Sequence, residues 1–194
     1  MQSLEALFLE QGFLHLSTEE LAKRLRCSKR SLYLLAPSRE ALFELVIERF
    51  LTRIRVDGAA ASRRAKNWTS AITGYLDAGV RGTRLAGAQF VRDLNTFGPG
   101  LTRLRDHQRM RVEGLEKIVA GGAEQGAFTK LHPKLVAEVL LNAGARMSDP
   151  DFLSSAELSM SQAYEELFRL VSYGLIPREK SPLARQSRSV APQD

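Results

Sequence analysis

The sequence is poor in the residues and patterns from which most catalytic and metal sites are built. Its one cysteine, Cys27, excludes an internal disulfide and a cysteine-rich zinc site, and it fits a reducing compartment. The three histidines, His15, His107 and His132, show no metal-ligand spacing with acidic residues or with one another. The sequence also has no phosphate-binding loop, nucleophile elbow or dinucleotide fingerprint. We therefore expect neither an enzyme nor a bound metal or cofactor.

Long apolar runs are missing too. No uninterrupted apolar segment reaches the roughly 18 residues that a membrane-spanning helix requires. The first residues, MQSLEALFLEQG, carry glutamates where a secretory signal peptide carries basic side chains. These two absences predict a cytoplasmic protein without a membrane partner.

The alternation of apolar and polar residues that marks a half-buried strand is absent as well, so we predict an all-α fold. Apolar residues recur instead at helical spacing, in segments separated by Gly, Pro and Ser. The expected helices cover about residues 2–11, 18–25, 29–36, 68–80, 83–97, 101–124, 133–147 and 154–174, and a longer helix opens with residues 41–50. The GPG sequence at 98–100 is an expected break, and the segment 57–66, DGAAASRRAK, is the expected weak point between two bodies.

The positive charge is concentrated at the two ends of the chain. The formal net charge is +6 in total, of which residues 1–66 carry +4, residues 67–176 carry none and residues 177–194 carry the rest. Such a basic end is typical of a protein that meets a polyanion. Within the first part, six basic residues and no acidic residue fall between Leu21 and Arg39.

The sequence around this basic stretch predicts two short helices joined by a tight turn. Ser17 followed by Glu20 matches a capping box for the first helix, whose apolar residues are Leu21, Ala22 and Leu25. Ser28 is the expected cap of the second, in which Leu32 and Leu35 should face inward. This arrangement fits a helix-turn-helix that reads the major groove of DNA. Lys29, Arg30 and Ser31 occupy the first turn of the second helix, where side chains reach base edges.

The same residues resemble the TetR/AcrR family of bacterial transcription regulators. The resemblance runs through LFLEQGF, STEELA, SKRSLY and SREAL, which together span about Leu4 to Phe50. It implies that Ser17, Tyr33 and Arg39 contact DNA phosphates. Two departures from the family pattern stand out. Arg26 replaces the glycine common in the turn, so a non-glycine residue is expected in the left-handed region, and the LLA sequence at 34–36 lacks a customary phosphate contact.

The resemblance also implies how the rest of the chain is organised. We expect a three-helix DNA-binding domain at 1–50, joined through a long fourth helix to a ligand-binding and dimerisation domain at 51–176, and a disordered polar tail at 177–194. The last two helices are expected to form the interface of a homodimer. Aromatic, flexible and polar side chains of the middle helices are the pocket candidates: Trp68, Tyr75, Phe90, Asp93, Phe97, His107, Met110 and Arg111.

The function predicted from these features is a homodimeric repressor that binds a double-stranded DNA operator and is released by a small-molecule inducer. One alternative is a helix-turn-helix regulator controlled by a protein partner, with no inducer. Another is an enzyme, which the missing catalytic motifs disfavour. A solvated basic face with no DNA partner would account for the charge run alone, but not for the caps and the spacing.

Overall fold

The computed structural model describes residues 1–175, so the tail predicted at 177–194 lies outside the described residues. The described part of the chain forms ten α-helices and no strand, in agreement with the all-α prediction. The helices are α1 (Gln2–Gln11), α2 (Thr18–Arg24), α3 (Lys29–Tyr33), α4 (Arg39–Arg64), α5 (Trp68–Thr83), α6 (Ala88–Thr96), α7 (Gly98–Glu124), α8 (Pro133–Arg146), α9 (Pro150–Ser155) and α10 (Met160–Leu175).

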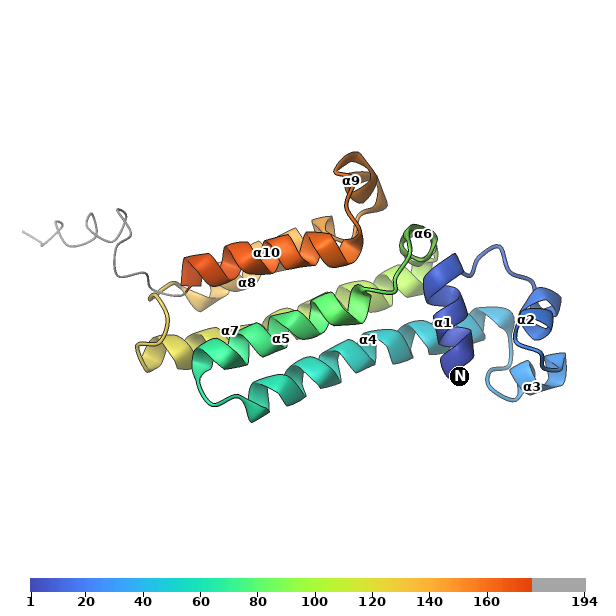
Figure 1. Cartoon of the computed structure of the whole chain (residues 1–194), viewed down its shortest axis with the longest axis horizontal. Coiled ribbons are helices and arrows are strands. Elements are labelled where there is room, and N and C mark those ends of the chain that lie inside the picture. The colour runs from blue at the N-terminus through green and yellow to red at the C-terminus, as the bar shows by residue number, and fades with distance from the viewer. Residues whose placement is uncertain (176–194) are drawn as a thin grey trace, which may run out of the picture.

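Helices α1 to α3 form a head at one end of an elongated molecule (Figure 1). The long helix α4 starts in this head and runs beside α5 and α7, against which it packs. Helix α8 packs on α7 and α10 packs on α5, so that both lie on the side of the molecule away from α4 (Figure 1). The helices behind the head therefore form a layered bundle in which α5 and α7 are the middle layer.

The core of the head is built from aromatic rings. Phe8, Phe13 and Phe43 are fully buried, and their ring centroids lie 4.9 to 5.7 Å apart. This cluster continues beyond the head, because Phe90 and Phe97 near α6 pack edge-on against Phe13 at 5.9 and 6.0 Å. The apolar core thus crosses residue 50, the predicted end of the DNA-binding domain.

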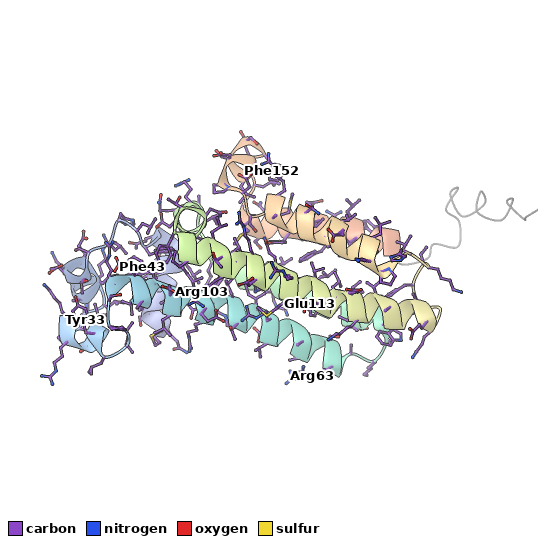
Figure 2. All side chains as sticks on the ribbon, turned by 180° about the vertical axis from the view of Figure 1, so that it is seen from behind. Tyr33, Phe43, Arg63, Arg103, Glu113 and Phe152 are labelled. Atoms are coloured by element: carbon purple, nitrogen blue, oxygen red, sulfur yellow. The ribbon has the colours of Figure 1, made fainter. Side chains whose placement is uncertain are left out.

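A second, smaller core lies at the other end of the bundle. It joins α5, α7 and α8, with Ile72 and Val119 fully buried and Leu76, Phe128 and Leu140 nearly so. Charged pairs also connect α4 to α7. Arg103 donates to Glu44 at 2.8 Å and to Glu48 at 3.0 Å, and it lies near the head in Figure 2.

The structure corrects several predicted boundaries near the middle of the chain. The segment 57–66 is not a weak point, because α4 continues through it to Arg64 and the chain turns only at residues 65–67. The helix predicted at 83–97 is interrupted: α5 runs to Thr83, and α6 begins after Gly87. Gly87 lies against α1, where its N–H donates to the Leu9 carbonyl at 2.8 Å and an added Cβ would come within 2.9 Å of the Glu10 carbonyl oxygen.

Two further boundaries were wrong in the second half of the chain. The GPG sequence at 98–100 begins α7 instead of breaking a helix, because proline is well accommodated in the first turn. The last predicted helix is two helices, α9 and α10, separated by a turn in which Glu157 has a φ of 54°. The Asp149 side chain caps α9 by accepting from the N–H groups of Asp151 and Phe152.

Candidate nucleic-acid interface and internal cavity

The helix-turn-helix of the head is fixed by two side-chain caps. Ser17 Oγ accepts from the Glu20 N–H at 3.2 Å, and the Glu20 carboxylate accepts from the Ser17 N–H at 2.8 Å, which completes the predicted capping box. The Ser17 N–H and the Ser17 hydroxyl both donate to the Glu20 carboxylate, which lowers the pKa of Glu20. Ser28 Oγ accepts from the Ser31 N–H at 3.0 Å and starts α3. The caps set the ends of both helices, so the turn between them has a defined length.

Arg26 lies in this turn with a φ of 51°, as the sequence predicts for the position where the family has glycine. The conformation costs a non-glycine residue about 1 to 2 kcal/mol. Neighbouring backbone bonds hold it, since the Arg26 N–H donates to the Lys23 carbonyl and the Cys27 N–H donates to the Ala22 carbonyl. The tight turn therefore forms without glycine.

The three predicted base-reading residues, Lys29, Arg30 and Ser31, lie together in α3 and are all exposed. Lys29 pairs with Glu19 of α2, and the hydrogen bond from Lys29 lowers the pKa of Glu19. Ser31 Oγ lies 2.9 Å from Ser28 Oγ. The guanidinium of Arg30 has no ion-pair or hydrogen-bond partner among the described residues, so its five donors are available to a ligand.

The three residues predicted to contact phosphates also lie in the head or at its junction with α4. Tyr33, at the end of α3, is 51% exposed and lies at the tip of the molecule (Figure 2). Arg39 Nη1 donates to the Leu16 carbonyl at 3.4 Å, next to Ser17, while its guanidinium lies 5.3 Å from the centre of the Phe43 ring. The Arg39 charge is thus held beside the N-terminus of α2.

One prediction for α3 was wrong. Leu35 does not face inward, because α3 ends at Tyr33 and the helical periodicity stops there. Leu34 and Leu35 are 79% and 41% exposed, and Ala36 takes the buried place instead. Two leucines therefore remain on the surface of the head, next to the basic side chains.

Behind the head, a cavity lies between α4, α5, α7, α8 and α10. Its volume is about 710 Å³ when its opening to solvent is included. The residues that line it are Phe50, Leu51, Ile54, Tyr75, Leu76, Gly79, Thr83, Leu94, Leu104, His107, Gln108, Arg111, Val112, Leu115, Leu140, Gly144, Met160, Tyr164, Leu167 and Phe168. Most are apolar, and the few polar groups are gathered on α5, α7 and α10, as in sites that bind small organic molecules.

Three of the predicted pocket residues, Tyr75, His107 and Arg111, line this cavity. Burial, followed by the charges of Arg111 and Arg55, lowers the pKa of His107 to about 3. His107 is therefore neutral near pH 7, and its Nδ1 lies 3.4 Å from Arg55 Nη1. Burial also lowers the pKa of Arg111 and raises that of Tyr75, because both charged forms are poorly solvated there.

The other five predicted pocket residues lie elsewhere. Phe90 and Phe97 pack into the aromatic core of the head, and Asp93 holds the head in place. Trp68 packs on α7 near its end and donates to Gln125 Oε1 at 2.9 Å, while Met110 is 43% exposed on the outer face of α7. An amphipathic pattern does not distinguish a core ring from a cavity ring, which explains these misplacements.

Asp93 forms the polar link between α6 and the head. Its Oδ2 accepts from the Phe13 N–H at 2.6 Å and from the Leu14 N–H at 2.9 Å, and its Oδ1 accepts from Gln89 Nε2 at 2.6 Å. Gly12, with a φ of 81°, allows this approach, because a Cβ there would come within 2.6 Å of Asp93 Oδ2.

Comparison with known proteins agrees with this geometry. Residues 2–46 match the family model described as bacterial regulatory proteins, tetR family. Residues 2–46 therefore form the DNA-binding domain that characterises TetR-family regulators. A search among curated proteins finds no match.

Solved structures of transcriptional regulators share the fold of this chain over about nine tenths of its length. The TetR-family regulator PfmR from Thermus thermophilus is 20% identical, with a TM-score of 0.64 over 90% of this chain and 98% of that one. NemR from E. coli in its reduced form is 18% identical, with a TM-score of 0.67 over 91% and 96% of the two chains. A regulator from Saccharomonospora viridis, solved in complex with choline, is 12% identical, with a TM-score of 0.68 over 91% and 95%.

Several residues that line the cavity are not among those predicted from the sequence. Phe50, Leu51 and Ile54 line it from α4. Tyr164 and Phe168 line it from α10, where their spacing of four residues puts them on one face. The four-residue spacing was the one sequence signal for these two residues, but it does not indicate whether the shared face lines a cavity or packs in a core.

No group of three or more His, Cys, Asp or Glu side chains within 1–175 is placed to hold a metal ion. None of the helices in the described range combines the length and the apolar character needed to cross a bilayer.

Proposed function

We propose that this TetR-family regulator is a homodimeric repressor whose release from its DNA operator is driven by a small molecule bound in the internal cavity. The observation that carries the proposal is the placement of α4. Its first turns carry Phe43 into the core of the head, and its middle presents Phe50, Leu51 and Ile54 to the cavity. A ligand that moves this wall moves a helix that also supports the reading head.

In this proposal Lys29, Arg30 and Ser31 contact base edges, and Ser17, Tyr33 and Arg39 contact phosphates. The exposed donors of Arg30 support the first role, since a guanidinium can bond both acceptors of a guanine. The exposure of Tyr33 at the tip of the head supports the second. Because one five-residue helix makes few contacts, a second copy reading the next turn of the groove is required for tight binding.

The homodimer is proposed to form through α8 and α10. Large apolar side chains are exposed on both helices: Leu135 by 61%, Val139 by 56%, Leu170 by 71% and Tyr173 by 56%. Both helices lie on the side of the bundle away from α4, and no other described helix covers their outer faces (Figure 1). An exposed apolar surface of this kind is typical of a subunit interface.

DNA binding is tested by fluorescence anisotropy of the full-length protein on its own upstream DNA, across a salt series. We expect steeply salt-dependent specific binding by the wild type, and its loss in the double variant Lys29→Ala/Arg30→Ala. The matched control is Arg63→Ala/Arg64→Ala, which removes two exposed charges at the far end of α4, where Figure 2 shows Arg63. If both double variants weaken DNA binding equally, the head acts only as a general basic surface and does not read the DNA sequence.

The dimer is tested by sedimentation of a Leu135→Glu/Leu170→Glu variant, which we expect to be monomeric and weakly DNA-binding. The alternative, control by a protein partner, is favoured by the exposed Leu34 and Leu35 beside the basic surface. A thermal-shift screen with apolar ligands separates the two, because a ligand that binds only the native state raises the melting temperature. A regulator without an inducer site responds to no compound in such a screen.

A further inference from the structure

The electrostatic character of the cavity is set by one residue. Arg111 is the only fully charged side chain among the lining residues, because the pKa of His107 is too low for it to carry a charge. No Asp or Glu side chain lines the cavity in the described part of the chain. A guanidinium stays protonated even when burial lowers its pKa, so the wall carries one uncompensated positive charge.

The protein holds this guanidinium in a fixed place. Arg111 Nη2 donates to the Tyr75 carbonyl at 3.0 Å, and its Cζ lies 4.5 Å from the centre of the Tyr75 ring. Two glycines leave room for it. A Cβ at Gly58 of α4 would come within 2.8 Å of Nη1, and one at Gly79 of α5 would come within 3.0 Å of Nη2. The arginine is therefore seated between α4, α5 and α7.

Part of its hydrogen-bonding capacity is left unused. Arg111 Nη1 is buried and has no hydrogen-bond partner in the part of the chain that the structure describes. The other buried side-chain atom without a partner in the described chain is Arg103 Nε, but that guanidinium is neutralised by Glu44 and Glu48. Arg111 has no such acid among residues 1–175. A buried donor without a partner costs free energy, and a buried charge without a counter-ion costs more.

The remaining polar groups of the wall already have partners within the protein. Gln108 Nε2 donates to the Gly144 carbonyl at 3.0 Å and to Ser148 Oγ at 3.2 Å. Tyr164 Oη lies 2.9 Å from the same Ser148 hydroxyl. Thr83 donates to the Gly79 carbonyl at 2.9 Å. The unsatisfied donor in the cavity is therefore Arg111, and the group that would satisfy it is a negatively charged hydrogen-bond acceptor.

We propose that the cavity binds an organic acid, a molecule with an apolar body and one carboxylate, and that the carboxylate pairs with Arg111. The apolar body fills the space between Phe50, Ile54, Leu115 and Phe168, and the acid supplies the counter-ion that the wall lacks. The inference rests on the proposed function for its role in releasing DNA. The same charge disfavours cationic ligands.

The test compares decanoic acid, decanol and decylamine, which share one apolar chain and differ in the head group. Binding to the full-length protein is measured by isothermal titration calorimetry at pH 7.5. We expect the acid to bind at least about tenfold more tightly than the alcohol, and the amine to bind most weakly. In Arg111→Gln the acid and the alcohol should bind equally. Arg109→Gln, an exposed arginine two residues away, should behave like the wild type.

Three results would overturn the inference: equal binding of acid and alcohol to the wild type, survival of the preference in Arg111→Gln, or no binding of the acid at all. Cooperative melting of each variant shows that it is folded, and Arg111→Met repeats the test with a second side chain. The comparison of acid and alcohol on the wild type does not depend on whether any variant folds.

The proposed function fails separately. If decanoic acid binds through Arg111 but leaves the DNA complex intact in the anisotropy assay, the proposal of a ligand-controlled repressor is wrong. The proposed acid site then still stands. If decanol binds as well as the acid and releases DNA, the proposed acid site is wrong and the proposal of a ligand-controlled repressor stands.

Discussion

Replacing Asp93 with alanine removes the polar link between α6 and the head, and its effect follows from the contacts. Asp93 is 4% exposed and accepts from the N–H groups of Phe13 and Leu14 and from Gln89. A hydrogen bond to a charged group contributes about 1.5 to 3 kcal/mol. The variant loses two hydrogen bonds from backbone N–H groups. The loss at Leu14 costs less, because this N–H is only partly buried and water can hydrate it. We expect the free energy of unfolding to fall by about 2 to 4 kcal/mol.

The assay is urea unfolding followed by circular dichroism. With a slope of about 2 kcal/mol per molar urea, the midpoint should fall by roughly 1 to 2 M. Asp106→Ala is the matched control, because this acid on α7 is exposed and paired only with Arg109, so its midpoint should barely change. Hydrogen exchange localises the effect to the Phe13 and Leu14 amides. A midpoint for Asp93→Ala within experimental error of the Asp106→Ala control would refute the assignment of Asp93 as the link.

Three further predictions concern Arg26, His107 and a pair of glycines, Gly82 and Gly144. Arg26→Gly should raise the free energy of unfolding by about 1 kcal/mol, because it removes the cost of a positive φ. The measurement is thermal melting, and a lower midpoint for the variant would contradict the prediction. His107 has a pKa of about 3 when folded and about 6.5 when unfolded, so the unfolded state binds the extra proton between these values. Wild-type stability should therefore fall relative to His107→Gln as the pH drops below 6.5, by up to about 1.4 kcal/mol per pH unit, and parallel pH profiles in urea titrations would disprove it. Gly82→Ala should destabilise by about 1 to 3 kcal/mol, because its methyl would overlap Ile54. Gly144→Ala, with open space at the Cβ, should instead stabilise by about 0.5 to 1 kcal/mol, and calorimetry showing the same sign for both would count against this packing argument.

The features that the sequence predicts correctly are those decided within a few residues. Ser17 and Glu20 are three positions apart, and the capping box they form depends on nothing else in the chain. The same holds for the Ser28 cap and for the positive φ of Arg26. The Leu35 prediction failed because α3 is only five residues long, and a helical face cannot be extrapolated past its end.

The cavity could not be predicted in the same way, because its walls come from helices far apart in the chain. Tyr75 and Phe90 are both buried aromatic residues at helical spacing, yet one lines the cavity and the other fills the core of the head. The difference depends on how α6 is oriented, and that is set by the contacts of Asp93 and Gly87 with α1. Such contacts, about 80 residues apart in the chain for Asp93 and Phe13, leave no mark on local periodicity.

The aromatic core that crosses residue 50 bears on how such regulators are re-engineered. A chimera cut at that residue would carry Phe13 and Phe43 on one fragment and their partners Phe90 and Phe97 on the other. A foreign head grafted at this point would meet rings shaped for different neighbours. A transplantable reading unit must therefore include α6 as well, together with its carboxylate at Asp93, so that the swapped part spans two separate stretches of the chain.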